Sequence, residues 1–245
     1  MTKAHLSTIL AALLLWASTA SAQSGGRNIC PPYTTPVKLN FTTENVPTTY
    51  SNDYNVTGIQ NVMRRRGHVI AGMHQRALGV TSSEIALSME ARTTSLKVSS
   101  GYCVYLTSVD VRFGYQSMDV YIASEFRPQS CEYRVILDHE NQHVAINRNG
   151  IREYAPRLRQ ILEQRLQRME PRFTANAQVS TDRKLTDLKE ALDPTMNELQ
   201  SVLAQRNAVI DNDNNYAAIA EMCKNWDQGN VWPVQPAPQQ QRRAP

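Results

Sequence analysis

Two histidines four residues apart, with a glutamate directly after the first, are the clearest chemical signal in this 245-residue chain. They are His139, Glu140 and His143, and they form the pattern His-Glu-x-x-His. On a helix, residues i and i+4 lie on one face about one turn apart, so both imidazoles can bind one zinc ion. The glutamate can then take a proton from a zinc-activated water. The spacing therefore predicts a catalytic zinc centre; the competing interpretation is a helix with two solvent-exposed histidines.

The residues around this pattern favour two long helices. Neither glycine nor proline occurs in 131–149, and apolar residues continue at helical spacing beyond it. Gly150 and Pro156 predict a kink or a brief break in this first helix. A second helical pattern covers 185–210, with a candidate restart at Pro194. We expect the two helices to form an antiparallel αα-hairpin.

A catalytic zinc usually has a third protein ligand, and the hairpin indicates where to find it. If the turn lies near residue 175, facing residues have numbers that add to about 350, so the two histidines should face 207–211. We expect a carboxylate from this region to complete the site. The candidates, in order of preference, are Glu221, Asp213 and Asp211.

Three further residues bear on the site. Tyr216 lies in the same region and could donate a hydrogen bond to an oxyanion. Glu163 has the sequence distance of a thermolysin-like third ligand, but one continuous helix would carry it about 30 Å from His143. It could bind only if the chain folded back between Gly150 and Pro156. The metzincin class is excluded, because Asn149 stands where its third histidine would be.

The segments before the zinc motif partly alternate apolar and polar residues, as β-strands do. The expected strands lie within 37–56, 81–90, 102–113 and 119–124. Residues 57–65 predict a short helix that Thr57 caps, and Gly114–Ser117 predicts a β-hairpin turn. The segment Asp119–Ser124 could align an extended substrate by strand addition. We therefore expect an α+β fold, in which a small antiparallel sheet packs on the zinc-motif helix and the helical hairpin follows.

Four cysteines, an even number, indicate two disulfides in an exported protein, with three possible connectivities. If the predicted hairpin turn centres near residue 117, facing strand residues add to about 234. Cys103 and Cys131 fit this relation, which leaves Cys30 to pair with Cys223. We predict these two bridges.

The two ends of the chain have compositions of their own. Residues 1–22 have the pattern of a secretory signal, with a short apolar core and an Ala-x-Ala cleavage site at Ala20–Ala22. Residues 231–245 are rich in proline and glutamine and are expected to form a disordered tail. This leaves 23–230 as a single domain. The chain should be secreted or periplasmic, without a transmembrane anchor, and its net charge of +4 is too small to indicate nucleic-acid binding.

The chain resembles a bacterial family of predicted secreted zinc-dependent proteases that is filed as a domain of unknown function. The shared features are the signal segment, the sequence Tyr-Asn-Val-Thr-Gly at 54–58, Cys103 in a β segment, and the zinc motif before a helical hairpin. The resemblance implies a zincin-like fold and peptidase chemistry. Two features depart from the family pattern: Gln142 replaces a usual glycine, and the region around Tyr216 lacks the family's C-terminal histidine.

These patterns together predict an exported zinc metallopeptidase that acts on protein or peptide substrates. Its expected metal ligands are His139, His143 and Glu221, with Glu140 as the general base and Tyr216 as an oxyanion donor. Two alternatives stay open. One is an exported binding or scaffold protein that keeps the helix without a working site. The other is an exported metal-binding protein without hydrolysis.

Overall fold

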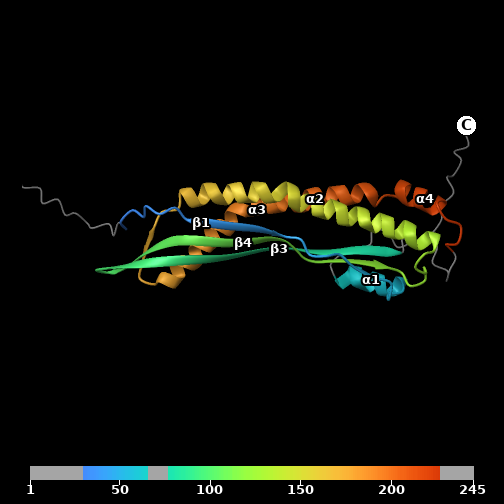
Figure 1. Cartoon of the computed structure of the whole chain (residues 1–245), viewed down its shortest axis with the longest axis horizontal. Helices are drawn as coiled ribbons and strands as arrows, with labels where there is room; N and C mark the ends of the chain where they lie inside the picture. Colours follow the sequence, from blue (N-terminus) through green and yellow to red (C-terminus); the bar gives the residue numbers. More distant parts are fainter. Residues whose placement is uncertain (1–29, 66–76, 227–245) are drawn as a thin grey trace, which may run out of the picture.

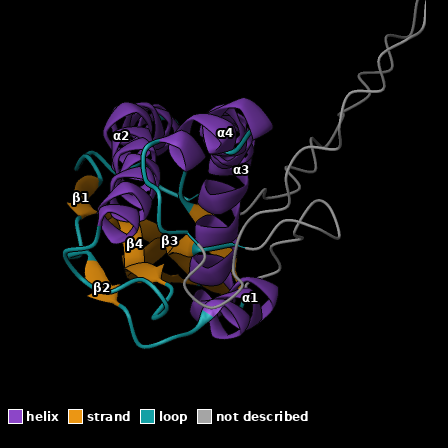
Figure 2. Ribbon diagram, turned by 90° about the vertical axis from the view of Figure 1, so that its right-hand side faces the viewer, coloured by secondary structure: helices purple, strands orange, loops and turns teal. Residues whose placement is uncertain are grey.

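A computed structural model describes residues 30–65 and 77–226 of the chain. The expected signal peptide, 1–22, and the expected tail, 231–245, lie outside these residues. Within them the fold is α+β, with two long helices on one face of a sheet and the short helix α1 on the other (Figures 1 and 2). No helix in the described ranges is long and apolar enough to cross a membrane.

The sheet is built on one long antiparallel hairpin, β3 (Gly79–Val98) and β4 (Gly101–Ile122). Three short strands follow one another along the other side of β4. They are β1 (Lys38–Glu44) and β2 (Thr49–Ser51), both parallel to β4, and β5 (Arg172–Thr174), which is antiparallel. The sheet is therefore mixed: its central hairpin is antiparallel, as expected, whereas β1 and β2 run parallel to β4.

The predicted turn at Gly114–Ser117 is wrong, because β4 continues through it. The chain reverses instead between β3 and β4, at residues 99–100. Gly114 is needed for a close approach of β1, since a Cβ there would lie 2.2 Å from the backbone oxygen of Glu44. The glycine thus marks a tight strand contact rather than a turn.

Both predicted disulfides are wrong for the same reason. The bridges are Cys30–Cys103 and Cys131–Cys223. The prediction depended on a hairpin turn near residue 117, and the true register places Cys103 opposite Leu96. Cys131, the first residue of the zinc-motif helix, is therefore joined to the C-terminal segment.

The helices match the expected segments, with longer continuous runs. They are α1 (Val56–Arg65), α2 (Cys131–Gln167), α3 (Ala177–Ile210) and α4 (Asp213–Glu221). Asn55, not Thr57, caps α1, because its Oδ1 accepts the Gly58 N–H at 2.8 Å. Helices α2 and α3 continue through Pro156 and Pro194. The single long helix expected around Gly150 and Pro156 is confirmed, and it has no break there.

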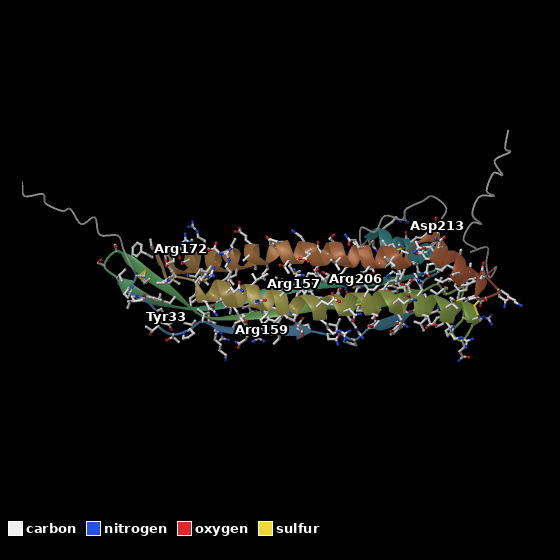
Figure 3. All side chains as sticks on the ribbon, turned by 90° about the horizontal axis from the view of Figure 1, so that it is seen from above. Tyr33, Arg157, Arg159, Arg172, Arg206 and Asp213 are labelled. Atoms are coloured by element: carbon white, nitrogen blue, oxygen red, sulfur yellow. A yellow bond between two sulfur atoms is a disulfide. The ribbon has the colours of Figure 1, made fainter. Side chains whose placement is uncertain are left out.

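Helices α2 and α3 lie side by side and form the predicted antiparallel hairpin (Figure 3). Ion pairs join them, with Arg157 2.6 Å from Glu198 and Arg206 2.8 Å from Glu153. Leucines beneath these pairs are fully buried and form the core between the hairpin and the sheet: Leu158, Leu162, Leu188, Leu192 and Leu199. The core fixes the register of the two helices, and with it the positions of the zinc-motif histidines opposite the end of α3.

Candidate metal centre

The two histidines of the zinc motif meet a carboxylate where α3 ends. His139 and His143 lie one turn apart on α2, and Asp211 is the C-cap residue of α3. Oδ1 of Asp211 lies 3.2 Å from Nε2 of His139 and 3.1 Å from Nε2 of His143. The two Nε2 atoms are 3.2 Å apart. Three donor atoms from two helices thus converge on one point.

This triangle has the dimensions that a zinc ion requires. Zinc bonds to imidazole nitrogen and carboxylate oxygen are about 2.0–2.2 Å long, so tetrahedral ligand atoms lie about 3.3 Å apart. Two nitrogens and one oxygen are also a common ligand set for catalytic zinc. His139, His143 and Asp211 form the group found among the described residues that could hold a metal.

The structure brings Asp211 into this cluster, and it leaves out the preferred candidate Glu221. Glu221 and Asp213 are both exposed on α4 and do not belong to the cluster. The helix breaks at Asp211, and Asn212 caps a new helix that carries the later residues away. Glu163 lies twenty residues beyond His143 on the unbroken α2 and pairs with Arg159, so it is far from the cluster.

Asn207 is a site residue that the sequence analysis missed. Nδ1 of His143 donates to Oδ1 of Asn207 at 2.8 Å. Such a bond from the second ring nitrogen is the usual support of a metal-ligating histidine, because it leaves Nε2 free to bind the metal. The sequence carries a signal that could have revealed it: Asn207 and Asp211 are also four residues apart, one turn of helix. Nδ1 of His139 has no hydrogen-bond partner in the described part of the chain.

Tyr216 lies at the site, as predicted, but its hydroxyl contacts Asp211. Its hydroxyl donates to Oδ1 of Asp211 at 2.8 Å, and its ring centroid is 5.6 Å from that of His139. Burial and the negative charge of Asp211 raise the pKa of the Tyr216 hydroxyl, so it stays protonated and can donate. In this conformation it stabilises the carboxylate rather than an open oxyanion position.

Glu140 lies on α2 and is buried against the first residues of β3. Its side chain is enclosed, with the residue only 4% exposed, and Oγ1 of Thr81 donates to its Oε2 at 2.8 Å. Gly79 makes room for it, since a Cβ there would lie 2.8 Å from Oε1 of Glu140. Burial raises the pKa of this carboxyl, and the charges of His143 and His139 only partly oppose the shift. A carboxyl with a raised pKa beside three potential metal ligands suits a general base.

The cluster is charged even without a metal. Burial lowers the pKa of His143, but the bonds to Asp211 and Asn207 and the charge of Glu140 outweigh it and raise that pKa to about 9. Burial of Asp211 is likewise outweighed by its bonds to His139 and His143, which hold its pKa well below the usual range. The metal-free site therefore contains an ion pair that lies partly out of solvent.

Solvent reaches the cluster from the side of Asp211. The side chains of His139 and His143 are 8% and 12% exposed, against 37% for Asp211. Strand addition to Asp119–Ser124 is not available at 119–121, because β3 and β2 already pair with both sides of these residues. The outer edge of β3, which begins beside Glu140, has no strand partner among the residues described.

The segment that carries Asp211 is fastened to the start of α2 by contacts outside the cluster. The Cys131–Cys223 disulfide closes this segment at its far end. Oε1 of the buried Glu132 accepts the Asn225 N–H at 2.9 Å, and the Trp226 ring lies 5.9 Å from that of Phe126. These contacts tie the segment that follows Asp211 and α4 to the start of α2 and to the residues just before it.

No known family model matches this chain, and no match was found among curated proteins or solved structures. The features of this chain that point to a function are the convergence of His139, His143 and Asp211 and the buried Glu140 next to them. These residues are compatible with metal binding followed by proton transfer.

Proposed function

We propose that this protein is an exported zinc-dependent metallopeptidase that hydrolyses peptide bonds. One observation carries the proposal: three donor atoms, from His139, His143 and Asp211, lie within 3.2 Å of one another beside a buried carboxyl. The carboxyl is Glu140, the residue that the zinc motif assigns as base. The resemblance to secreted zinc-dependent proteases supports the same activity, and the packing of the motif helix on a sheet is consistent with a zincin-like fold.

Each residue of the site has a role in this proposal. His139, His143 and Asp211 would hold the zinc. The zinc would act as a Lewis acid on a water molecule and on the scissile carbonyl. Glu140 accepts a proton from that water and passes it to the leaving amine. Thr81 keeps the Glu140 carboxyl in place. Tyr216 would turn from Asp211 toward the oxyanion as charge develops there.

Export is supported by the two disulfides. Disulfides form and persist outside the cytosol, and both bridges have ordinary Cα separations, of 5.4 and 5.9 Å. The signal pattern in 1–22 points to the same compartment. The proposed location is secreted or periplasmic.

Metal content and three substitutions test the proposal. The mature protein, purified without chelators, should contain about one zinc per chain, and His139→Ala and His143→Ala variants should lose it. Glu140→Gln should keep the zinc and lose hydrolysis of a mixed peptide library. A zinc-free wild-type protein, or a fully active Glu140→Gln variant, would contradict the proposal.

A second candidate is an exported metal-binding protein without hydrolysis. The observation that favours it is the enclosure of both imidazoles, at 8% and 12% exposure, which limits the space for a peptide. In that case the wild type would bind zinc and cleave no member of the library. Glu140→Gln would then change neither property.

A further inference from the structure

Asn207 contacts residues of the candidate metal site on both α2 and α3. Its side-chain oxygen accepts from Nδ1 of His143 on α2 at 2.8 Å, and its backbone oxygen accepts the N–H of Asp211 at 3.0 Å. The first contact reaches across the helical hairpin and the second closes the last turn of α3. Asn207 is thus bonded both to a histidine ligand and to the carboxylate ligand.

The two helices present matched pairs of residues to each other. His139 and His143 are one turn apart on α2, and Asp211 and Asn207 are one turn apart at the end of α3. Because the helices are antiparallel, His139 faces Asp211 and His143 faces Asn207. The four side chains thus form two facing pairs. Asn207 is the one of the four that does not belong to the group of potential metal ligands.

We propose that Asn207 is a positioning residue that sets the orientation and tautomer of the His143 ring for metal binding. This inference rests on the proposed zinc site. An amide oxygen accepts and cannot donate, so it requires a proton on Nδ1 and leaves Nε2 to point at the cluster. The same residue holds Asp211 through the helix C-cap. Among the described residues Nδ1 of His139 has no hydrogen-bond partner, so the Asn207 contact is the one described hydrogen bond to the second ring nitrogen of either histidine.

Zinc affinity in a matched series of variants tests the inference. Asn207→Leu removes the acceptor, and its zinc affinity should fall by about 10- to 100-fold, as for other partners of metal-bound histidines. Asn207→Asp restores an acceptor and should recover at least the wild-type affinity. Asn197→Leu, the same change at an exposed position of α3, should leave the affinity unchanged. An Asn207→Leu variant that binds zinc as tightly as the wild type would overturn the inference.

A metal-free measurement separates this inference from the proposed function. Histidine-selective NMR of the metal-free protein should show a slowly exchanging Nδ1 proton on His143 in the wild type and in Asn207→Asp. That proton should exchange rapidly in Asn207→Leu. If the wild type shows this pattern but binds no zinc, the proposed function fails while the positioning of His143 stands. If the Nδ1 proton of the wild type already exchanges rapidly, Asn207 does not position His143.

Discussion

Replacing Asp211 by alanine should abolish tight zinc binding, because Asp211 supplies the one carboxylate of the cluster. Its Oδ1 lies within 3.2 Å of Nε2 of both His139 and His143. The neighbouring acids Asp213 and Glu221 are exposed on α4 and do not belong to the cluster. Neither is placed to take over as ligand while α4 keeps its position.

The size of the effect follows from the role of the residue. Losing a residue that only supports a ligand costs about 10- to 100-fold in metal affinity, so losing a ligand should cost more than about 100-fold. The metal-free protein should also become less stable, because Asp211 pairs with His143. The Asp211 side chain is 37% exposed, so the loss should lie between those of surface and buried pairs, about 1–3 kcal/mol.

The assay is competition for zinc against a chromophoric chelator, with denaturant unfolding of each metal-free protein as a second measurement. Asp213→Ala and Glu221→Ala are matched controls, since each removes one carboxylate from the same region. Only Asp211→Ala should lose zinc. If Asp211→Ala binds zinc like the wild type, Asp211 is not a zinc ligand. If Glu221→Ala loses zinc instead, α4 folds back over the histidines in solution.

Three other changes probe the supports of the site. Removing the Cys131–Cys223 bridge by serine substitution should cost about 2–5 kcal/mol of stability and weaken zinc binding. Removing the Cys30–Cys103 bridge should affect stability alone. Unfolding and zinc titrations of both variants check this. Gly114→Ala should lower the free energy of unfolding by at least about 1–3 kcal/mol in a denaturant titration, since the new Cβ would meet a backbone oxygen of β1 at 2.2 Å. Thr81→Val removes the hydroxyl that donates to Glu140, so peptide hydrolysis should fall while zinc content, measured on the same samples, stays at the wild-type level.

The candidate site was partly readable from the sequence, because helices are regular. The spacing of His139 and His143 placed both rings on one helix face, and the hairpin register correctly pointed to 207–211. The choice of Glu221 within that region failed at a local event. The helix stops at Asp211, and Asn212 accepts the Asn215 N–H at 2.9 Å to begin another helix. Helical periodicity does not predict in which direction the chain continues after such a break.

The sheet was harder to predict, because its pairing depends on contacts between distant segments. Gly114 has the residue type of a turn, yet it lies within a 22-residue strand because β1 passes too close for a side chain. The true reversal, at 99–100, contains two serines and precedes Gly101. Moving the turn by this distance changes every cross-strand pair, so the disulfides inferred from it, Cys103–Cys131 and Cys30–Cys223, were wrong as well.

The least predictable contacts are those that hold the site together without a metal. Thr81 and Glu140 are 59 residues apart, and the disulfide from Cys131 spans 92 residues; neither separation follows from any local pattern. Yet these contacts order Glu140, the proposed base, and the segment of Asp211, the proposed carboxylate ligand. A metal that binds groups already in place does not have to pay the conformational entropy of gathering them. We therefore expect zinc to add little secondary structure to this protein, in contrast to small zinc domains that fold only when the metal binds.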